Sequence, residues 1–208
     1  MPDRVARLPR NHVGYPVPWF VAWIDGVPDF RVANAAKVRQ ATRSRLCWIC
    51  GRPLGPWTAA FLIGPMCGVS HTSAEPPSHE ECAVYAAQAC PWLATPTMRR
   101  REGGRPAGFY DPAGVMITRN PGVALVWVSA RYFTVPAPGG VGFLFNIGEP
   151  LKVMWYAHGR AATRAEVVAS LNSGMPTLRE AANVGGPAAH VELDERMEAL
   201  LALVPAGP

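Results

Sequence analysis

Alternating hydrophobic and polar positions predict short strands and turns near the start of the chain. The run "WFVAWIDGVPDFRV" alternates around Asp25-Gly26, a pair typical of tight turns, and this predicts a β-hairpin after an irregular, proline-rich arm over residues 1–18. The next segment, "ANAAKVRQATRSR", contains no glycine or proline and predicts a short basic helix. The apolar run "TAAFLIGPMC" then predicts a strand that ends at Gly64-Pro65.

The segment "SHEECAVYAAQACPWL" has the signals of a capped helix. Ser78 can accept a hydrogen bond at the helix start, and Glu81 stands three residues further on, which is the spacing of a capping box. Pro91 is expected to end this helix. The following stretch, "TPTMRRREGGRPAG", is typical of a linker. We therefore divide the chain into residues 1–105 and residues 106–208, with one continuous domain as the alternative.

The pattern changes to strands and then to helices in the second half. Strands are expected at "GVMITR", "VALVWVSARYFTV", "GFLFNIG" and "LKVMWYA", with a turn at "PGGVG" between two of them. Thr163 and Glu166 have the spacing of a second capping box, and Pro176 fits the first turn of a further helix. The last helix is expected to bury one apolar stripe, formed by Leu193, Met197, Leu200, Leu201 and Val204.

The composition indicates a folded protein rather than a disordered or membrane-spanning one. Apolar residues make up 49% of the 208 residues and charged residues only 17%, so a sizeable core is expected. No signal-peptide pattern and no apolar run long enough to cross a bilayer is visible in the sequence. We therefore expect a bacterial-type cytoplasm, where cysteines stay reduced and close cysteine spacings favour metal or redox chemistry over disulfides.

Two pairs of ligand-type residues predict a metal site. Cys47 and Cys50 form a C-x-x-C pair that is followed by "GRPLGP", a stretch that cannot begin a helix, so a thioredoxin-like redox role is disfavoured. His79 and Cys82 lie three residues apart in the first turn of the predicted helix and therefore share one face. A pair on a turn and a pair on a helix are combined in treble-clef zinc sites, and zinc accepts a Cys₃His set.

Other residues could replace a ligand or add chemistry. The reserve ligands are Cys67 and Cys90, and two inert buried cysteines in the C-x-x-C pair are a further alternative. His71 lies between the two ligand pairs, where nucleases of the HNH type carry their general base, although no companion aspartate or asparagine completes that pattern. No catalytic residue is assigned, because P-loop, G-x-S-x-G and H-E-x-x-H motifs are absent from the sequence.

Positive charge is concentrated in the half that contains the cysteines. Residues 1–110 hold 13 basic and 7 acidic side chains, a net of +6, whereas residues 111–208 hold 7 and 8, a net of −1. Such a field attracts polyanions, and arginine binds phosphate while tryptophan, here Trp48 or Trp57, can stack on bases. An ordinary solvated surface is the alternative. The arginines expected to contact nucleic acid are Arg39, Arg43, Arg45, Arg52, Arg99, Arg100 and Arg101.

Together these patterns predict an α+β protein in which a treble-clef-like, zinc-binding N-terminal half packs on a small antiparallel sheet with C-terminal helices. The first hypothesis for its function is a zinc-stabilised protein that binds nucleic acid or a nucleic-acid complex. The second is an adaptor or inhibitor of phage or host origin that binds a protein through its tryptophans and acidic last helix. The third is an HNH-like, metal-dependent nuclease.

Three quoted stretches carry a resemblance that spans nearly the whole chain. They are "GYPVPWFVAWIDGVPDFRV", the core "CWICGRPLG…FLIGPMC…SAEPPSHEECAVYAAQACPWL…MRRREG", and "WYAHGRAATRAEVVASLNSGMP". With them the chain resembles an uncharacterised protein family of actinobacteria, other bacteria and their phages or prophages. The resemblance implies one folded unit in a bacterial or phage-infected cytoplasm. It implies no activity and no catalytic residue.

Overall fold

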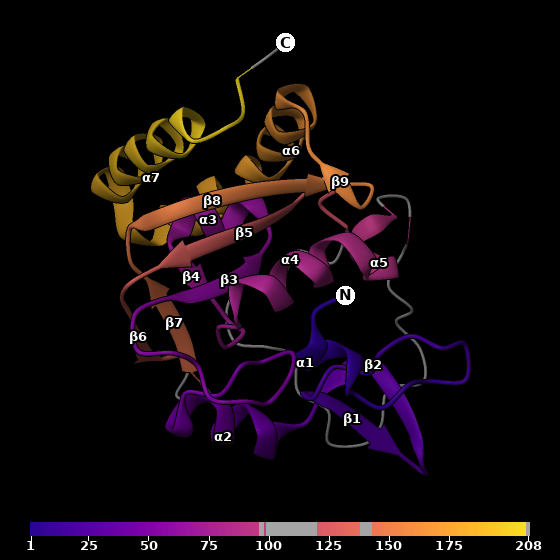
Figure 1. The fold of residues 1–208 in the computed structure, drawn as a ribbon. Helices are drawn as coiled ribbons and strands as arrows, with labels where there is room; N and C mark the ends of the chain where they lie inside the picture. Colours follow the sequence, from indigo (N-terminus) through magenta and orange to yellow (C-terminus); the bar gives the residue numbers. More distant parts are fainter. Residues whose placement is uncertain (96–97, 99–119, 138–142, 207–208) are drawn as a thin grey trace.

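A four-stranded antiparallel sheet forms the centre of the protein (Figure 1). The computed structural model describes residues 1–95, 98, 120–137 and 143–206. The strands of the central sheet, in spatial order, are β3 (Ala59–Ile63), β5 (Ala124–Ser129), β8 (Pro150–Ala157) and β9 (Arg160–Ala161). Every residue of β5 is buried, because this strand has a neighbour on each side and helices over both faces. The expected α+β class is confirmed.

Three helices pack on one face of the central sheet and enclose the main core. They are α3 (Pro65–Ser70), α6 (Arg164–Ala182) and α7 (Gly186–Ala202). Trp127 of β5 and Trp155 of β8 point into this core, and their indole N–H groups donate to the carbonyls of Gly148 and Leu203 at 2.9 and 3.0 Å. The predicted stripe of α7 is confirmed, since each of its five residues is buried in or packs against this core.

Helix α4 (Glu80–Ala89) covers the opposite face of the central sheet (Figure 1). Its small Ala83 and Ala87 side chains are fully buried against alternate residues of β3 and β5, which lets the helix approach the sheet closely. The other side of α4 carries Cys82 and Tyr85, which pack against the first part of the chain. The short helix α5 (Pro91–Ala94) follows it. Thus α4 connects the central sheet to the N-terminal segments.

Two smaller sheets, two short α-helices and one 3₁₀ helix complete the described structure. The predicted hairpin is confirmed as β1 (Val21–Ile24) and β2 (Val27–Ala33), and positive φ angles of 49° and 77° at Asp25 and Gly26 form its turn. The second small sheet has the order β4-β7-β6. The remaining elements are β4 (Thr72–Ser73), β6 (Tyr132–Pro136), β7 (Phe143–Ile147), α1 (Asp3–Ala6), α2 (Ala35–Ser44) and the 3₁₀ helix η1 (Asn183–Gly185).

Segments from both predicted regions share the central sheet. Strand β3, from residues 1–105, pairs along its whole length with β5, from residues 106–208. The predicted boundary, the strand expected at "GVMITR" and the turn expected at "PGGVG" lie outside the described residues. Among the described residues, the structure contains no helix with the length and apolar character needed to cross a membrane.

Two predictions about helix ends are wrong. Helix α4 begins at Glu80 with His79 at its cap, because the backbone of Ser78 pairs instead with Ala60 of β3, with hydrogen bonds of 2.7 and 2.9 Å. Pro176 does not begin a helix but lies within α6. Residues on both sides of this proline face the main core, so packing outweighs the cost of about 3 kcal/mol that proline carries inside a helix.

The predicted capping box at the start of α6 is confirmed, and its loss is expected to be measurable. Thr163 Oγ1 accepts from the Glu166 N–H at 3.3 Å, and the Glu166 carboxylate accepts from the Thr163 N–H at 2.8 Å. Thr163→Ala is expected to lower the free energy of unfolding by about 1 kcal/mol in urea titrations. Thr58→Ala, at an exposed threonine, is the control and should change it by less than about 0.5 kcal/mol.

Glu166 also makes this helix start sensitive to acid. Hydrogen bonds from Arg160, and then from Thr163, lower the pKa of Glu166 from its usual 4.5 to about 2. A carboxyl group with a lowered folded-state pKa stabilises the fold above its unfolded pKa, and this contribution is lost as the pH falls from about 4.5 towards 2. Glu166→Gln should therefore show a shallower loss of stability over that interval; an unchanged acid profile would contradict this assignment.

Candidate metal centre

The C-x-x-C pair is held in a tight turn directly after α2. Helix α2 ends at Arg45, whose φ of 49° reverses the chain. The Cys47 N–H then donates to the Arg52 carbonyl at 2.7 Å, and the Gly51 N–H donates to the Cys47 carbonyl at 2.8 Å. Gly51 has a φ of 72°, which a residue with a Cβ adopts only with strain. We call residues 47–53 the knuckle.

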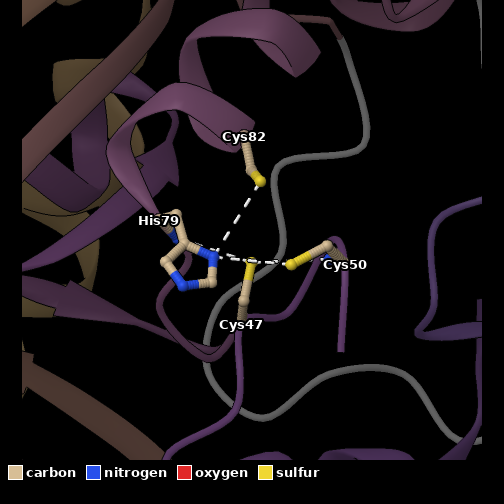
Figure 2. Close-up of side chains that lie close together, drawn as sticks. All are labelled: Cys47, Cys50, His79 and Cys82. Atoms are coloured by element: carbon tan, nitrogen blue, oxygen red, sulfur yellow. Dashed lines mark hydrogen bonds between the residues drawn. The ribbon is translucent and has the colours of Figure 1, made fainter. Parts of the chain in front are cut away.

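The second ligand pair is positioned by the start of α4. His79 is the N-cap of this helix, and Cys82 is its third residue. Figure 2 shows the imidazole of His79 beside the three cysteines, with its Nδ1 atom directed towards their sulfurs. Nδ1 lies 3.4 Å from Cys50 Sγ and 4.0 Å from Cys82 Sγ. Its Nε2 atom is 3.0 Å from the Pro53 carbonyl, which can only accept a hydrogen bond. Nε2 therefore carries the proton, and the Nδ1 lone pair faces the sulfurs.

The four predicted ligands form one compact cluster that could hold a metal ion. One ligand atom from each of Cys47, Cys50, His79 and Cys82 lies within 4.8 Å of all the others. Cys47 and Cys82 are fully buried, and Cys50 is 8% exposed. The cluster is surrounded by apolar side chains from three elements, including Val5 of α1. A closed, largely buried group of three sulfurs and one nitrogen is suited to a borderline-soft metal ion.

The electrostatics of the three thiols also favour a bound cation. Hydrogen bonds from the thiols of Cys50 and Cys82, together with backbone N–H groups of Cys50 and His79 at 3.4 Å, lower the pKa of Cys47. Hydrogen bonding to Cys47 in turn raises the pKa values of Cys50 and Cys82. Each thiolate therefore makes ionisation of its neighbours less favourable, whereas a divalent cation would stabilise all three thiolates together.

The two reserve ligands and His71 lie elsewhere. Cys67, in α3, packs against the main core, and burial raises its pKa to about 11. Cys90 is the C-cap of α4. The ring of His71 lies 5.0 Å from that of Trp127, and its Nδ1 atom is 3.8 Å from a carboxylate oxygen of Glu149. None of these three residues belongs to the Cys/His cluster.

The structure brings only part of the predicted arginine set close to the knuckle. Arg45 and Arg52 lie near each other, because the residues next to them, Leu46 and Pro53, form an antiparallel bridge. Arg39 and Arg43 are exposed on α2, and the Arg45 guanidinium lies 5.1 Å from the ring of Tyr132. Arg99, Arg100 and Arg101 lie outside the described residues.

Sequence reasoning missed two arginines that lie beside the knuckle. Part of the N-terminal arm expected to be irregular forms α1, which buries Val5 and presents Arg4 and Arg7 next to Arg52. The signal was available in "DRVARL", where arginines at a spacing of three flank apolar residues. The expectation that Trp48 could stack on bases is wrong, since it is 4% exposed and stacks on Phe20.

Gly51 offers a test of how tightly the knuckle is packed. A Cβ on Gly51 would lie 2.5 Å from the ring of Trp19, whereas a Cβ on Gly26, which has a similar φ of 77°, would meet no atom within 4 Å. Gly26→Ala is therefore expected to cost about 1–2 kcal/mol of unfolding free energy from backbone strain alone. Gly51→Ala should cost clearly more in the same urea titration and should weaken metal retention. Equal losses of unfolding free energy in the two variants would show that the Trp19 ring can move aside without cost.

Comparison of the chain with known protein families, with curated proteins and with solved structures finds no match.

Proposed function

We propose that Cys47, Cys50, His79 and Cys82 bind one zinc ion with a structural role, in a treble-clef-like arrangement. In a tetrahedral site with Zn–S bonds of ~2.3 Å, the ligand atoms lie roughly 3.5–3.8 Å apart. The sulfur–nitrogen distances of 3.4 and 4.0 Å bracket that spacing. Four protein ligands fill the tetrahedron, which is characteristic of structural zinc, whereas catalytic zinc keeps an open position.

We further propose that the basic surface fixed by this centre binds nucleic acid. The observation that carries this proposal is a set of four exposed arginines on the knuckle and the adjoining α2, none of which has a carboxylate partner among the described residues. They are Arg39, Arg43, Arg45 and Arg52. Guanidinium groups without a carboxylate partner can contact phosphate bidentately, and Arg45 can do so while it lies over the ring of Tyr132. The metal keeps the knuckle and α2 in a defined position, so these charges stay together.

The salt dependence of binding tests the proposal. Fluorescence anisotropy with labelled oligonucleotides should detect binding at 50 mM salt that weakens steeply towards 200 mM. If four arginines each contact one phosphate, the logarithm of the binding constant should fall against the logarithm of the salt concentration with a slope of about −3 to −4. Absence of binding at 50 mM salt, or binding independent of salt, would contradict the proposal.

The two alternative functions have weaker support. For the protein-binding alternative, the acidic last helix was the expected contact, but Asp194 and Glu192 form ion pairs with Arg179 and Arg196 within the fold, at 2.6 and 2.5 Å. For the nuclease alternative, His71 would have to act beside the metal, yet its ring packs on Trp127 and it is not a member of the Cys/His cluster.

A further inference from the structure

Two adjoining hollows run along the knuckle, beside the metal centre. One, of about 420 Å³, lies between α1 and the knuckle, and the other, of about 400 Å³, reaches the start of α4. Both are lined by Arg4 and Pro53, so these two open hollows adjoin at those residues, and we call them together the knuckle groove. Its lining residues that matter here are Arg4, Arg7, Arg52, Pro53, Trp57 and His79.

One end of the knuckle groove is positively charged. Three arginines, Arg4, Arg7 and Arg52, and a single carboxylate, Asp3, line it, a net of +2. Arg4 is held by an ion pair with Glu81 at 3.1 Å, whereas Arg7 and Arg52 have no carboxylate partner within the described part of the chain. Asp3 and Glu81 offset part of this charge, and an anion placed between the Arg7 and Arg52 guanidinium groups would offset the rest. This end therefore has the chemistry of a phosphate site.

The other end of the groove carries an aromatic ring that faces solvent. Trp57 is 80% exposed, more than any other of the seven tryptophans, and it makes no ring contact among the described residues. Exposing a ring of this size is unfavourable unless a ligand covers it, because a tryptophan buries 150–250 Å² when it is packed. An indole face is a suitable platform for a nucleobase, which stacks on it irrespective of sequence.

One wall of the groove is attached to the proposed metal centre. It includes His79, whose Nε2–H donates to the carbonyl of Pro53, a residue that lines both hollows. The same histidine faces the cysteine sulfurs through its other nitrogen (Figure 2). A bound metal ion would therefore anchor this wall, and a preorganised site loses less entropy on binding.

We propose that the knuckle groove binds single-stranded nucleic acid, with Arg7 and Arg52 on backbone phosphates and Trp57 stacked on a base. This inference rests on the proposed nucleic-acid function and assigns it a site and a substrate form. A single strand offers a phosphate and an unpaired base face together, whereas a duplex buries its base faces between neighbouring pairs. The groove therefore selects single strands over duplexes of the same length.

Binding of labelled 12-nucleotide strands to the full-length, zinc-loaded protein tests this inference. Oligothymidylate and oligouridylate are compared, each with its duplex as a competitor. The comparison shows whether the groove binds single-stranded DNA or single-stranded RNA. Trp57→Ala is expected to weaken single-strand binding about fivefold to a hundredfold and to abolish the preference over duplex, while Trp57→Phe keeps most of the affinity. Quenching of tryptophan emission by the strand should disappear in Trp57→Ala.

A matched pair of double variants tests the arginine end. Arg7→Ala/Arg52→Ala should reduce the salt slope for single strands by about 1.4, or 0.7 for each lost phosphate contact. Arg39→Ala/Arg43→Ala removes the same charge from α2, outside the groove. It should reduce the slope equally for single strands and duplexes and leave the preference for single strands unchanged. Metal content and melting temperature must be unchanged in all four variants, which separates loss of the groove from loss of the fold.

The possible outcomes separate the two proposals. One outcome is that Trp57→Ala and Arg7→Ala/Arg52→Ala bind oligonucleotides like the wild type, whereas Arg39→Ala/Arg43→Ala binds them more weakly. This outcome would refute binding in the knuckle groove but would still support the nucleic-acid function. Duplex binding equal to single-strand binding likewise overturns the groove. If neither single strands nor duplexes bind at 50 mM salt, both proposals fail.

Discussion

Replacing Cys47 or Cys82 by serine is expected to release the metal and to unfold the first part of the chain. Both side chains are fully buried and lie in the cluster that joins α1, the knuckle and α4. Apparent binding free energies of structural zinc are about 10–16 kcal/mol in zinc-finger peptides, comparable to the whole stability of a typical domain. Metal analysis by mass spectrometry should give about one zinc per wild-type chain and less than about a tenth of that in either variant.

Thermal unfolding provides the second measurement of the same change. Each kcal/mol lost lowers the melting temperature of a domain of this size by about 2–4 °C, so a fall of at least about 10 °C is expected. Cys90→Ser is the matched control, because Cys90 lies at the other end of α4 and outside the cluster. It should retain the metal and the melting temperature. A Cys47→Ser protein that keeps one equivalent of zinc would refute the assigned ligand set.

The second large effect is expected at Trp127, in the middle of the central sheet. Trp127 is 1% exposed, packs in the main core and donates from its indole N–H to the Gly148 carbonyl. Trp127→Ala should lower the free energy of unfolding by about 3–5 kcal/mol, because it leaves a cavity in a close-packed core and removes the partner of that carbonyl. The change is read from the midpoint of urea unfolding.

Trp57→Ala is the control for this substitution, since it deletes the same side chain from a position that is 80% exposed. It should change the free energy of unfolding by no more than about 0.5 kcal/mol. The pair therefore separates the structural from the binding role of tryptophan in this chain. If Trp57→Ala destabilised the fold as strongly as Trp127→Ala, Trp57 could not serve as a free stacking surface.

Local signals in the sequence predicted those parts of the fold that local chemistry determines. Asp25-Gly26 favours one type of turn wherever it occurs, and the Thr163–Glu166 box is complete within four residues. Ser78 has the same local signal, yet its backbone is used by Ala60 of β3, a partner that the sequence pattern does not reveal. The predicted helix cap at Ser78 is therefore wrong because a long-range pairing uses the same backbone groups.

The candidate site likewise has one part that local spacing predicts and one part that depends on long-range packing. The spacing of Cys47, Cys50, His79 and Cys82 was sufficient to predict the cluster that forms, because each pair lies within a single turn. The groove beside it could not be predicted in this way. It depends on α1 packing against the knuckle through Val5, which brings Arg7 next to Arg52 from 45 positions away in the chain. Such packing is decided by shape and burial rather than by spacing.

The pairing of β3 with β5, a strand much later in the chain, has a consequence for folding during synthesis. All four cluster residues lie between positions 47 and 82, so they leave the ribosome well before β5 at residues 124–129. Until β5 is synthesised, the apolar strand β3 lacks the strand with which it pairs and is prone to aggregate. Early capture of a metal ion would join the nascent knuckle to α4, whose alanine face covers β3, and would shield that strand while translation continues.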